Sequence, residues 1–102
     1  MEMMKKTYEN IAHRFFISPE QLLQDSLKFY LLHRKQEFLN ERFEILSRYA
    51  VTNANELEGK IKQGILPEHP IWEELIDLRN LEQEIQGIQN DLDCLSKSGI
   101  HC

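Results

Sequence analysis

The side chains best suited to chemistry in this chain are histidines and cysteines, and they are scattered. They are His13, His33, His69, His101, Cys94 and Cys102. No H-x-x-x-H or E-x-x-H pairing places two ligands on one helical face, as metal sites in helix bundles require. The last three of these residues lie near one another at the C-terminal end, but a zinc site needs a fourth ligand and none is in sight. We therefore predict no metal site and no cofactor.

Other catalytic arrangements are also missing from the sequence. Carboxylates cluster at Glu73, Glu74 and Asp77 and again at Glu82 and Glu84, but a di-metal site would need Glu-x-x-His steps on facing helices. There is no Ser/His/Asp arrangement, no glycine loop that could cradle phosphate, and no nucleophile in a basic setting. We predict that the protein is not an enzyme.

The charge is uneven along the 102 residues. Residues 1–50 carry a net charge of +1 and residues 51–102 a net charge of −6, which gives −5 for the chain. An acidic protein is a poor non-specific ligand for polyanions. No run of about 18 apolar residues suggests a membrane span, and the N-terminal residues lack an apolar signal core. We expect a cytoplasmic protein whose two cysteines are free thiols.

One stretch, residues 18–49, organises the rest of the chain and has the pattern of a single long amphipathic helix. It opens Ser18-Pro19-Glu20-Gln21, with a hydroxyl at the N-cap, proline at the first helical position and glutamine placed to complete a capping box. No glycine or proline interrupts it before residue 51. A helix of this length spans roughly 45 Å, whereas a compact domain of this size has a radius of gyration of about 13 Å. We therefore expect the helix to extend beyond its own fold.

Three further helical segments complete a single all-α domain, residues 1–102. The pattern predicts short helices over residues 3–16 and 54–63, the latter capped by Asn53 and ended by Gly64. A long helix with a coiled-coil-like heptad spacing follows over residues 68–96, and residues 97–102 are expected to fray. The predicted architecture is a helical hairpin of long helices 19–49 and 68–96, joined by a short helix and preceded by another.

Two apolar seams of this length exceed what the short helices can cover. We therefore predict a homodimer that forms a four-helix-type bundle, with a small protein as a possible further partner and no membrane contact. Most aromatic residues are expected to pack in the core, but one of Phe29 and Tyr30 must point away from the apolar stripe, where it is a candidate for contact with a partner. The predicted oligomer or partner interface consists of Leu31, Phe38, Ile45, Leu78, Leu81, Ile85, Ile88 and Leu92.

An alternative hypothesis is a small transcriptional regulator that uses residues 5–28. The stretch from Ile11 to Leu22 has the spacing of a helix-turn-helix motif, with small Ala12 at the close approach. Phe16 stands where that motif prefers glycine, and Asp25 stands where it usually buries an aliphatic residue. An ordinary helical corner is therefore favoured over DNA binding. The candidate DNA contacts are Lys5, Lys6, Arg14, Gln21, Gln24 and Lys28.

Three segments carry a resemblance to a known group of proteins. They are Ile17-Ser18-Pro19-Glu20-Gln21-Leu22-Leu23, then Arg48-Tyr49-Ala50-Val51 with Glu56-Leu57-Glu58, then His69-Pro70-Ile71-Trp72-Glu73-Glu74-Leu75-Ile76-Asp77-Leu78. Together they resemble short, uncharacterised, all-helical prokaryotic proteins from cyanobacteria and archaea, over about residues 11–95. The resemblance implies an antitoxin-type partner of a small toxin, with no catalytic residue, a DNA-binding end at residues 5–28 and a partner-binding end on the long helices. A self-associating helical bundle with a purely structural role is the remaining alternative.

Overall fold

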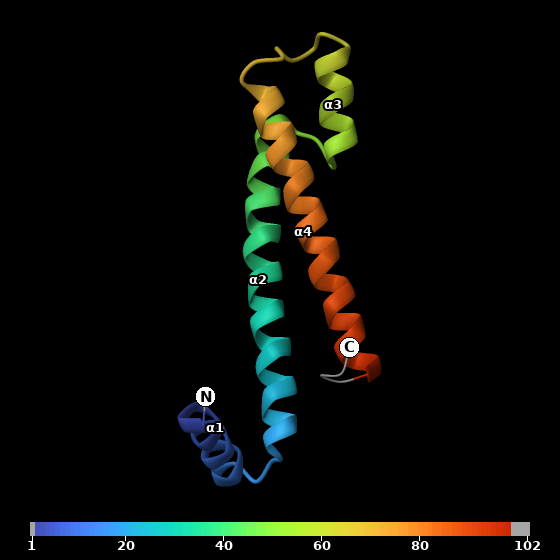
Figure 1. The fold of residues 1–102 in the computed structure, drawn as a ribbon. Coiled ribbons are helices and arrows are strands. Elements are labelled where there is room, and N and C mark those ends of the chain that lie inside the picture. The colour runs from blue at the N-terminus through green and yellow to red at the C-terminus, as the bar shows by residue number, and fades with distance from the viewer. Residues whose placement is uncertain (1, 99–102) are drawn as a thin grey trace.

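A computed structural model describes residues 2–98 and contains only helices over that range. They are α1 (Glu2–Arg14), α2 (Pro19–Tyr49), α3 (Ala54–Lys62) and α4 (Ile71–Ser98). Figure 1 shows α2 and α4 side by side as a hairpin, with α3 against one end of it and α1 at the other end. The predicted all-α helical hairpin is confirmed.

The long helix α2 begins at the predicted N-cap and ends before Ala50. The Ser18 side chain accepts a hydrogen bond of 3.0 Å from the backbone N–H of Gln21, and Pro19 occupies the first turn, where it loses no helical hydrogen bond. The other half of the capping box does not form, because the Gln21 side-chain amide donates to Asp25 instead, at 2.8 Å. At the other end, Ala50 takes the left-handed conformation (φ 54°) that ends many helices.

The short helix α3 is held at both ends by the predicted residues. The Asn53 side chain accepts a hydrogen bond of 2.8 Å from the backbone N–H of Glu56. The Glu56 carboxylate reaches back and accepts from the hydroxyl of Thr52 at 2.6 Å and from its backbone N–H at 3.0 Å. Gly64 follows the helix with a positive φ of 74°, a conformation that glycine adopts without steric cost.

The hydrogen bonds at this cap lead to a pH-dependent prediction. Those from the hydroxyl and N–H of Thr52 lower the pKa of Glu56 below its ordinary value of 4.5. A lowered pKa stabilises the fold above pH 4.5, and this contribution is lost as the pH falls through the folded-state pKa. We expect Glu56→Gln to lower the free energy of unfolding at pH 7. The further decrease in this free energy between pH 7 and pH 3 should be smaller in the variant than in the wild type. Urea unfolding at the two pH values, with exposed Glu44→Gln as the control, measures this difference. Equal acid sensitivity in both variants would contradict it.

Five helix boundaries differ from those predicted, by one to three residues. Helix α1 begins at Glu2 and not at residue 3, α3 ends at Lys62 and not at residue 63, and α4 continues to Ser98, past the residue at which fraying is expected to begin. The other two differences have local steric reasons. Helix α4 begins at Ile71 and not at residue 68, because Pro70 disfavours the helical conformation of the residue before it. Helix α1 ends at Arg14 and not at residue 16, because Phe16 adopts a left-handed backbone conformation with φ 59°. The chain therefore turns earlier at the first corner than its apolar spacing suggests.

A cluster of buried apolar side chains lies where α3 packs against the hairpin. It joins the ends of α2 and α4 to α3. Beyond α3 the hairpin is only two helices wide, and the molecule measures 60 × 24 × 21 Å with a radius of gyration of 19.6 Å. This exceeds the value of about 13 Å typical of a compact domain of this size, so much of α2 has no cover on its outer sides. The members of the cluster are Leu46, Val51, Ala54, Leu57, Ile61, Ile71, Leu75 and Leu78.

Candidate functional site

The molecule exposes a large total surface for its mass, and many large apolar side chains contribute to that surface. Its accessible surface is 7680 Å², whereas the scaling law for folded monomers gives about 6,100 Å² for a protein of this mass. Several aromatic residues that we expected in the core are exposed, so that expectation is wrong for them. The exposed large apolar residues are Phe15, Phe16, Leu23, Leu27, Phe29, Tyr30, Leu32, Phe43, Ile65, Trp72 and Ile76.

Part of this surface forms a stripe along α2. Leu23, Leu27 and Tyr30 are exposed and follow one another at intervals of four and three residues, which places them on one side of a helix. The same spacing continues through Arg34 to Phe38, where the guanidinium carbon lies 4.7 Å from the centre of the aromatic ring. The N-terminal half of α2 thus presents an apolar surface that the rest of the described chain covers only in part.

Towards α3 this stripe leads into a groove between α2 and α4, which we call the acidic groove. Its volume is about 360 Å³. Three apolar side chains meet three carboxylates there, and none of these carboxylates takes part in a hydrogen bond or ion pair with another described residue. A groove of this composition favours a partner that is both apolar and basic. The lining residues are Phe38, Glu41, Ile45, Asp77, Asn80, Leu81 and Glu84.

The corner between α1 and α2 carries a second exposed apolar feature. Ala12 is completely buried there, and its carbonyl accepts a hydrogen bond of 3.1 Å from the N–H of Ile17. Phe16 is 96% exposed and has a positive φ of 59°, which is unfavourable for a bulky side chain. Neither the backbone conformation nor the exposure of Phe16 benefits the single chain. A side chain in this position is well suited to contact another molecule.

Several residues of the predicted oligomer interface are occupied within the single chain. Leu78, Leu81, Ile88 and Leu92 are buried, while Leu31, Phe38, Ile45 and Ile85 are half-buried. The heptad spacing thus describes the seam between α2 and α4 of one hairpin. The role of these eight residues in an oligomer stays a prediction. The side chains that are most exposed to a partner are those of the stripe on α2 and of the corner.

Two of the candidate DNA-reading side chains already have partners in the fold. The Gln24 side-chain amide donates to the carbonyl of Leu95 in α4, at 3.2 Å, and that of Gln21 donates to Asp25. The end of α4 therefore lies over this side of the start of α2. The remaining candidates, Lys5, Lys6, Arg14 and Lys28, are exposed. The predicted hairpin already places the end of α4 beside the start of α2, but no local pattern indicates which side chains meet there.

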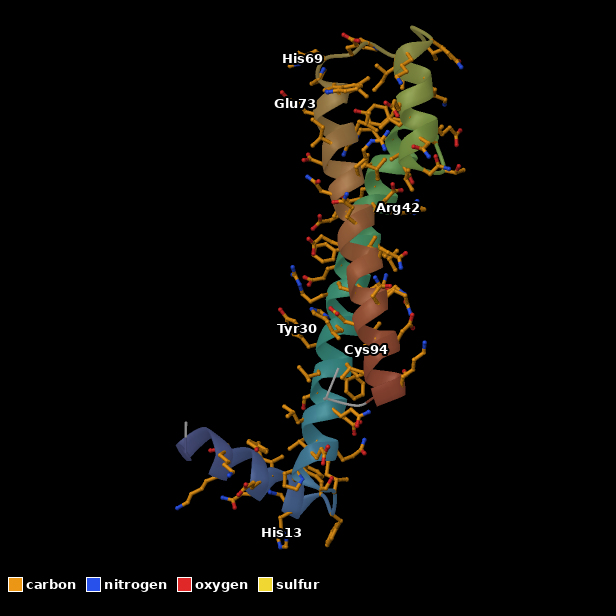
Figure 2. The ribbon with its side chains drawn as sticks, turned by 45° about the vertical axis from the view of Figure 1, so that its right-hand side comes forward. His13, Tyr30, Arg42, His69, Glu73 and Cys94 are labelled. Carbon is orange, nitrogen blue, oxygen red and sulfur yellow. The ribbon has the colours of Figure 1, made fainter. Side chains whose placement is uncertain are left out.

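Among the described residues, the histidines and Cys94 are not gathered into one site. Figure 2 shows His13 at the α1–α2 corner and His69 at the opposite end of the molecule, near the start of α4. Within residues 2–98, no three His, Cys, Asp or Glu side chains are grouped closely enough to hold a metal ion. Cys94 is disulfide-bonded, so the expectation of a free thiol is wrong for this residue. His101 and Cys102 lie outside the described residues.

Ion pairs fasten the α3 end of the hairpin. Arg42 in α2 pairs with Glu82 in α4 at 2.9 Å and also donates to the carbonyl of Thr52 at 3.2 Å. Arg48 pairs with Glu74, beside Tyr49. Burial raises the pKa of Tyr49 above 10.0, and the nearby Glu74 carboxylate acts in the same direction. A phenol with a raised pKa stays neutral at ordinary pH, so this network has a structural character.

None of the helices within residues 2–98 combines the length and the apolar composition needed to cross a membrane. No curated protein and no solved structure matches the chain. A family model does match it, over residues 1–100, and that family is described as the uncharacterized protein MJ0235 family. Because this match covers nearly the whole sequence, the chain belongs to the MJ0235 family.

Proposed function

We propose that the protein is a non-enzymatic protein-interaction module whose working unit is a homodimer. The observation that carries this proposal is the accessible surface of 7680 Å², which is about 1,600 Å² more than a compact monomer of this mass exposes. If each of two copies buried this excess, the interface would total about 3,200 Å², within the range of obligate homodimers. The exposed stripe on α2 supplies apolar side chains for such an interface.

The proposal is tested by the mass of the purified protein in solution. We expect sedimentation equilibrium to give twice the 12.2 kDa of the chain. The thermal unfolding temperature should also rise with protein concentration, because association stabilises the folded state by mass action. A mass of one chain up to high micromolar concentration, together with an unfolding temperature independent of concentration, would contradict the proposal.

The regulator hypothesis has less support than the interaction module. Its two base-reading candidates, Gln21 and Gln24, are engaged within the fold, and a carboxylate at Glu20 stands at the helix start, where it repels phosphate. The antitoxin hypothesis is a more specific form of the interaction module, but no feature of the described residues selects a toxin as the partner. We therefore propose the interaction module without assigning it to a toxin pair.

A further inference from the structure

We propose that the first helix of one copy docks into the acidic groove of a second copy, and that the exchange is reciprocal in an antiparallel homodimer. We call residues 5–16, which include most of α1 and the corner after it, the arm. This inference rests on the proposed homodimer and specifies the surface through which the copies meet. Three observations support it: the complementary charges of the arm and the groove, their apolar side chains, and the length of the hairpin.

The charges of the arm and the groove are complementary. Lys5, Lys6 and Arg14 are exposed and form no ion pair with another described residue, whereas Glu9 is the only acidic residue in the arm. The groove presents the unpaired carboxylates of Glu41, Asp77 and Glu84. Opposite charges across an interface favour association and fix the register of the partners.

The apolar surfaces of the arm and the groove also fit one another. Phe15 and Phe16 are exposed at the end of the arm, and the groove contains Phe38, Ile45 and Leu81. Phe15 follows α1 directly, and its backbone N–H still donates to the carbonyl of Ile11. By helical spacing, Lys5 and Arg14 flank the side that carries Ile11 and Phe15, while Lys6 lies on the opposite side. An apolar stripe flanked by cations thus meets an apolar floor bordered by carboxylates.

The arm is free to reach a second copy. In Figure 1, α1 projects away from the hairpin, and among the helices it contacts chiefly the first turns of α2. Its attachment is the close contact at buried Ala12. Docking against a partner therefore requires no unfolding of the α2–α4 hairpin.

The length of α2 sets the arrangement of the two copies. The groove residues of α2, Phe38 to Ile45, lie roughly 29–39 Å along the helix from Pro19. In an antiparallel pair, the partner's arm reaches that level when the two-fold axis passes close to Tyr30. The exposed stripe of Leu23, Leu27 and Tyr30 then lies between the arm and the groove, where the same pairing covers it. One symmetric contact thus covers the exposed corner, the exposed stripe and the acidic groove of both copies.

Charge reversal tests the contact in the full-length chain. The arm variant carries Lys5→Glu and Arg14→Glu, and the groove variant carries Glu41→Lys and Glu84→Lys. Each variant alone places like charges opposite one another in both contacts of its own homodimer. Mixing the two variants restores opposite charges in both contacts of the heterodimer. Lys6→Glu in the arm and Glu44→Lys on α2 are control variants that each reverse one charge away from the proposed contact, and they are compared with the single reversals Lys5→Glu and Glu41→Lys.

We expect the dissociation constant of each reversed homodimer to rise by about 30-fold or more, from the loss of close charge pairs and the addition of repulsion. The mixture should form a heterodimer within about threefold of the wild-type affinity, while the controls stay near the wild type. Sedimentation of the separate and mixed proteins measures these constants. Restoration on mixing also shows that the variants are folded.

The outcomes separate this inference from the proposed function. A wild-type monomer overturns both. A wild-type dimer whose affinity is unchanged in the reversed variants overturns the arm–groove contact and leaves the homodimer standing. Weakened variants that do not pair on mixing also overturn the contact, and so does an equal effect of the control variants.

Discussion

Replacement of Leu78 by alanine is expected to lower the free energy of unfolding by about 3 kcal/mol, within the range of 2–5 kcal/mol seen for large-to-small changes in cores. Leu78 is completely buried and belongs to the cluster that joins the ends of α2 and α4 to α3. The variant loses the transfer free energy of the deleted methyl and methylene groups and leaves a cavity that the neighbouring helices can fill only in part. Urea unfolding at one fixed protein concentration measures the change.

Two matched variants show whether the effect comes from this site. Leu78→Met keeps the volume nearly constant and should cost less than about 1.5 kcal/mol. Leu32→Ala removes the same groups from an exposed position on α2 and should cost well under half of what Leu78→Ala costs. If Leu78→Ala and Leu32→Ala were equally destabilising, the cluster around α3 would not be the main source of stability.

The helices of this protein follow from short-range rules that can be read in the sequence. Ser18 and Asn53 act as caps in the structure because a side-chain oxygen at the N-cap satisfies a backbone N–H that has no helical partner. Gly64 ends the third helical segment because it accepts a positive φ. Such signals depend only on neighbours a few residues away, so a single sequence is enough to read them.

Which helix or partner covers each apolar face could not be predicted from the sequence in the same way. A heptad spacing indicates that a helix has an apolar seam, but it does not say whether another helix of the same chain or a second copy fills that seam. Leu78 and Leu92 turn out to be buried within one hairpin, whereas Phe29 and Phe43 are exposed. A two-helix hairpin covers only one side of each helix, and which side it covers depends on the angle at which α4 returns.

The candidate site was predicted only in part, for a related reason. Its apolar residues Phe38, Ile45 and Leu81 stand in the predicted interface, but its carboxylates do not. The acidic groove draws on residues of α2 and α4 that are about 40 positions apart in the sequence, such as Glu41 and Leu81. No local pattern links these positions. At the corner, Phe16 looked like an imperfect turn residue, and only its exposure and positive φ show that it costs the single chain more than it contributes.

The substitution Ala12→Asp is expected to detach α1 from the hairpin while leaving α2, α3 and α4 folded. Ala12 is completely buried at the corner, so an aspartate there would place an unpaired charge in an apolar contact. The chain can avoid this cost by releasing α1, because the contacts of α1 with other helices are mainly those with α2. An isolated helix of 13 residues is marginal in water, so the released segment should lose its helical structure.

Amide hydrogen exchange distinguishes this local release from general unfolding. Protection should disappear across α1 and stay close to the wild-type level in α2 and α4, and circular dichroism should lose the contribution of 13 helical residues. Asn10→Asp, an exposed change on the same helix, adds the same charge and should leave protection intact. Retained protection in α1 would show that the corner tolerates a charge at this position. Loss of protection throughout the chain would show that α1 supports the hairpin as a whole. In that case the corner would be part of the cooperative core, and it could not act as the attachment point of a mobile arm.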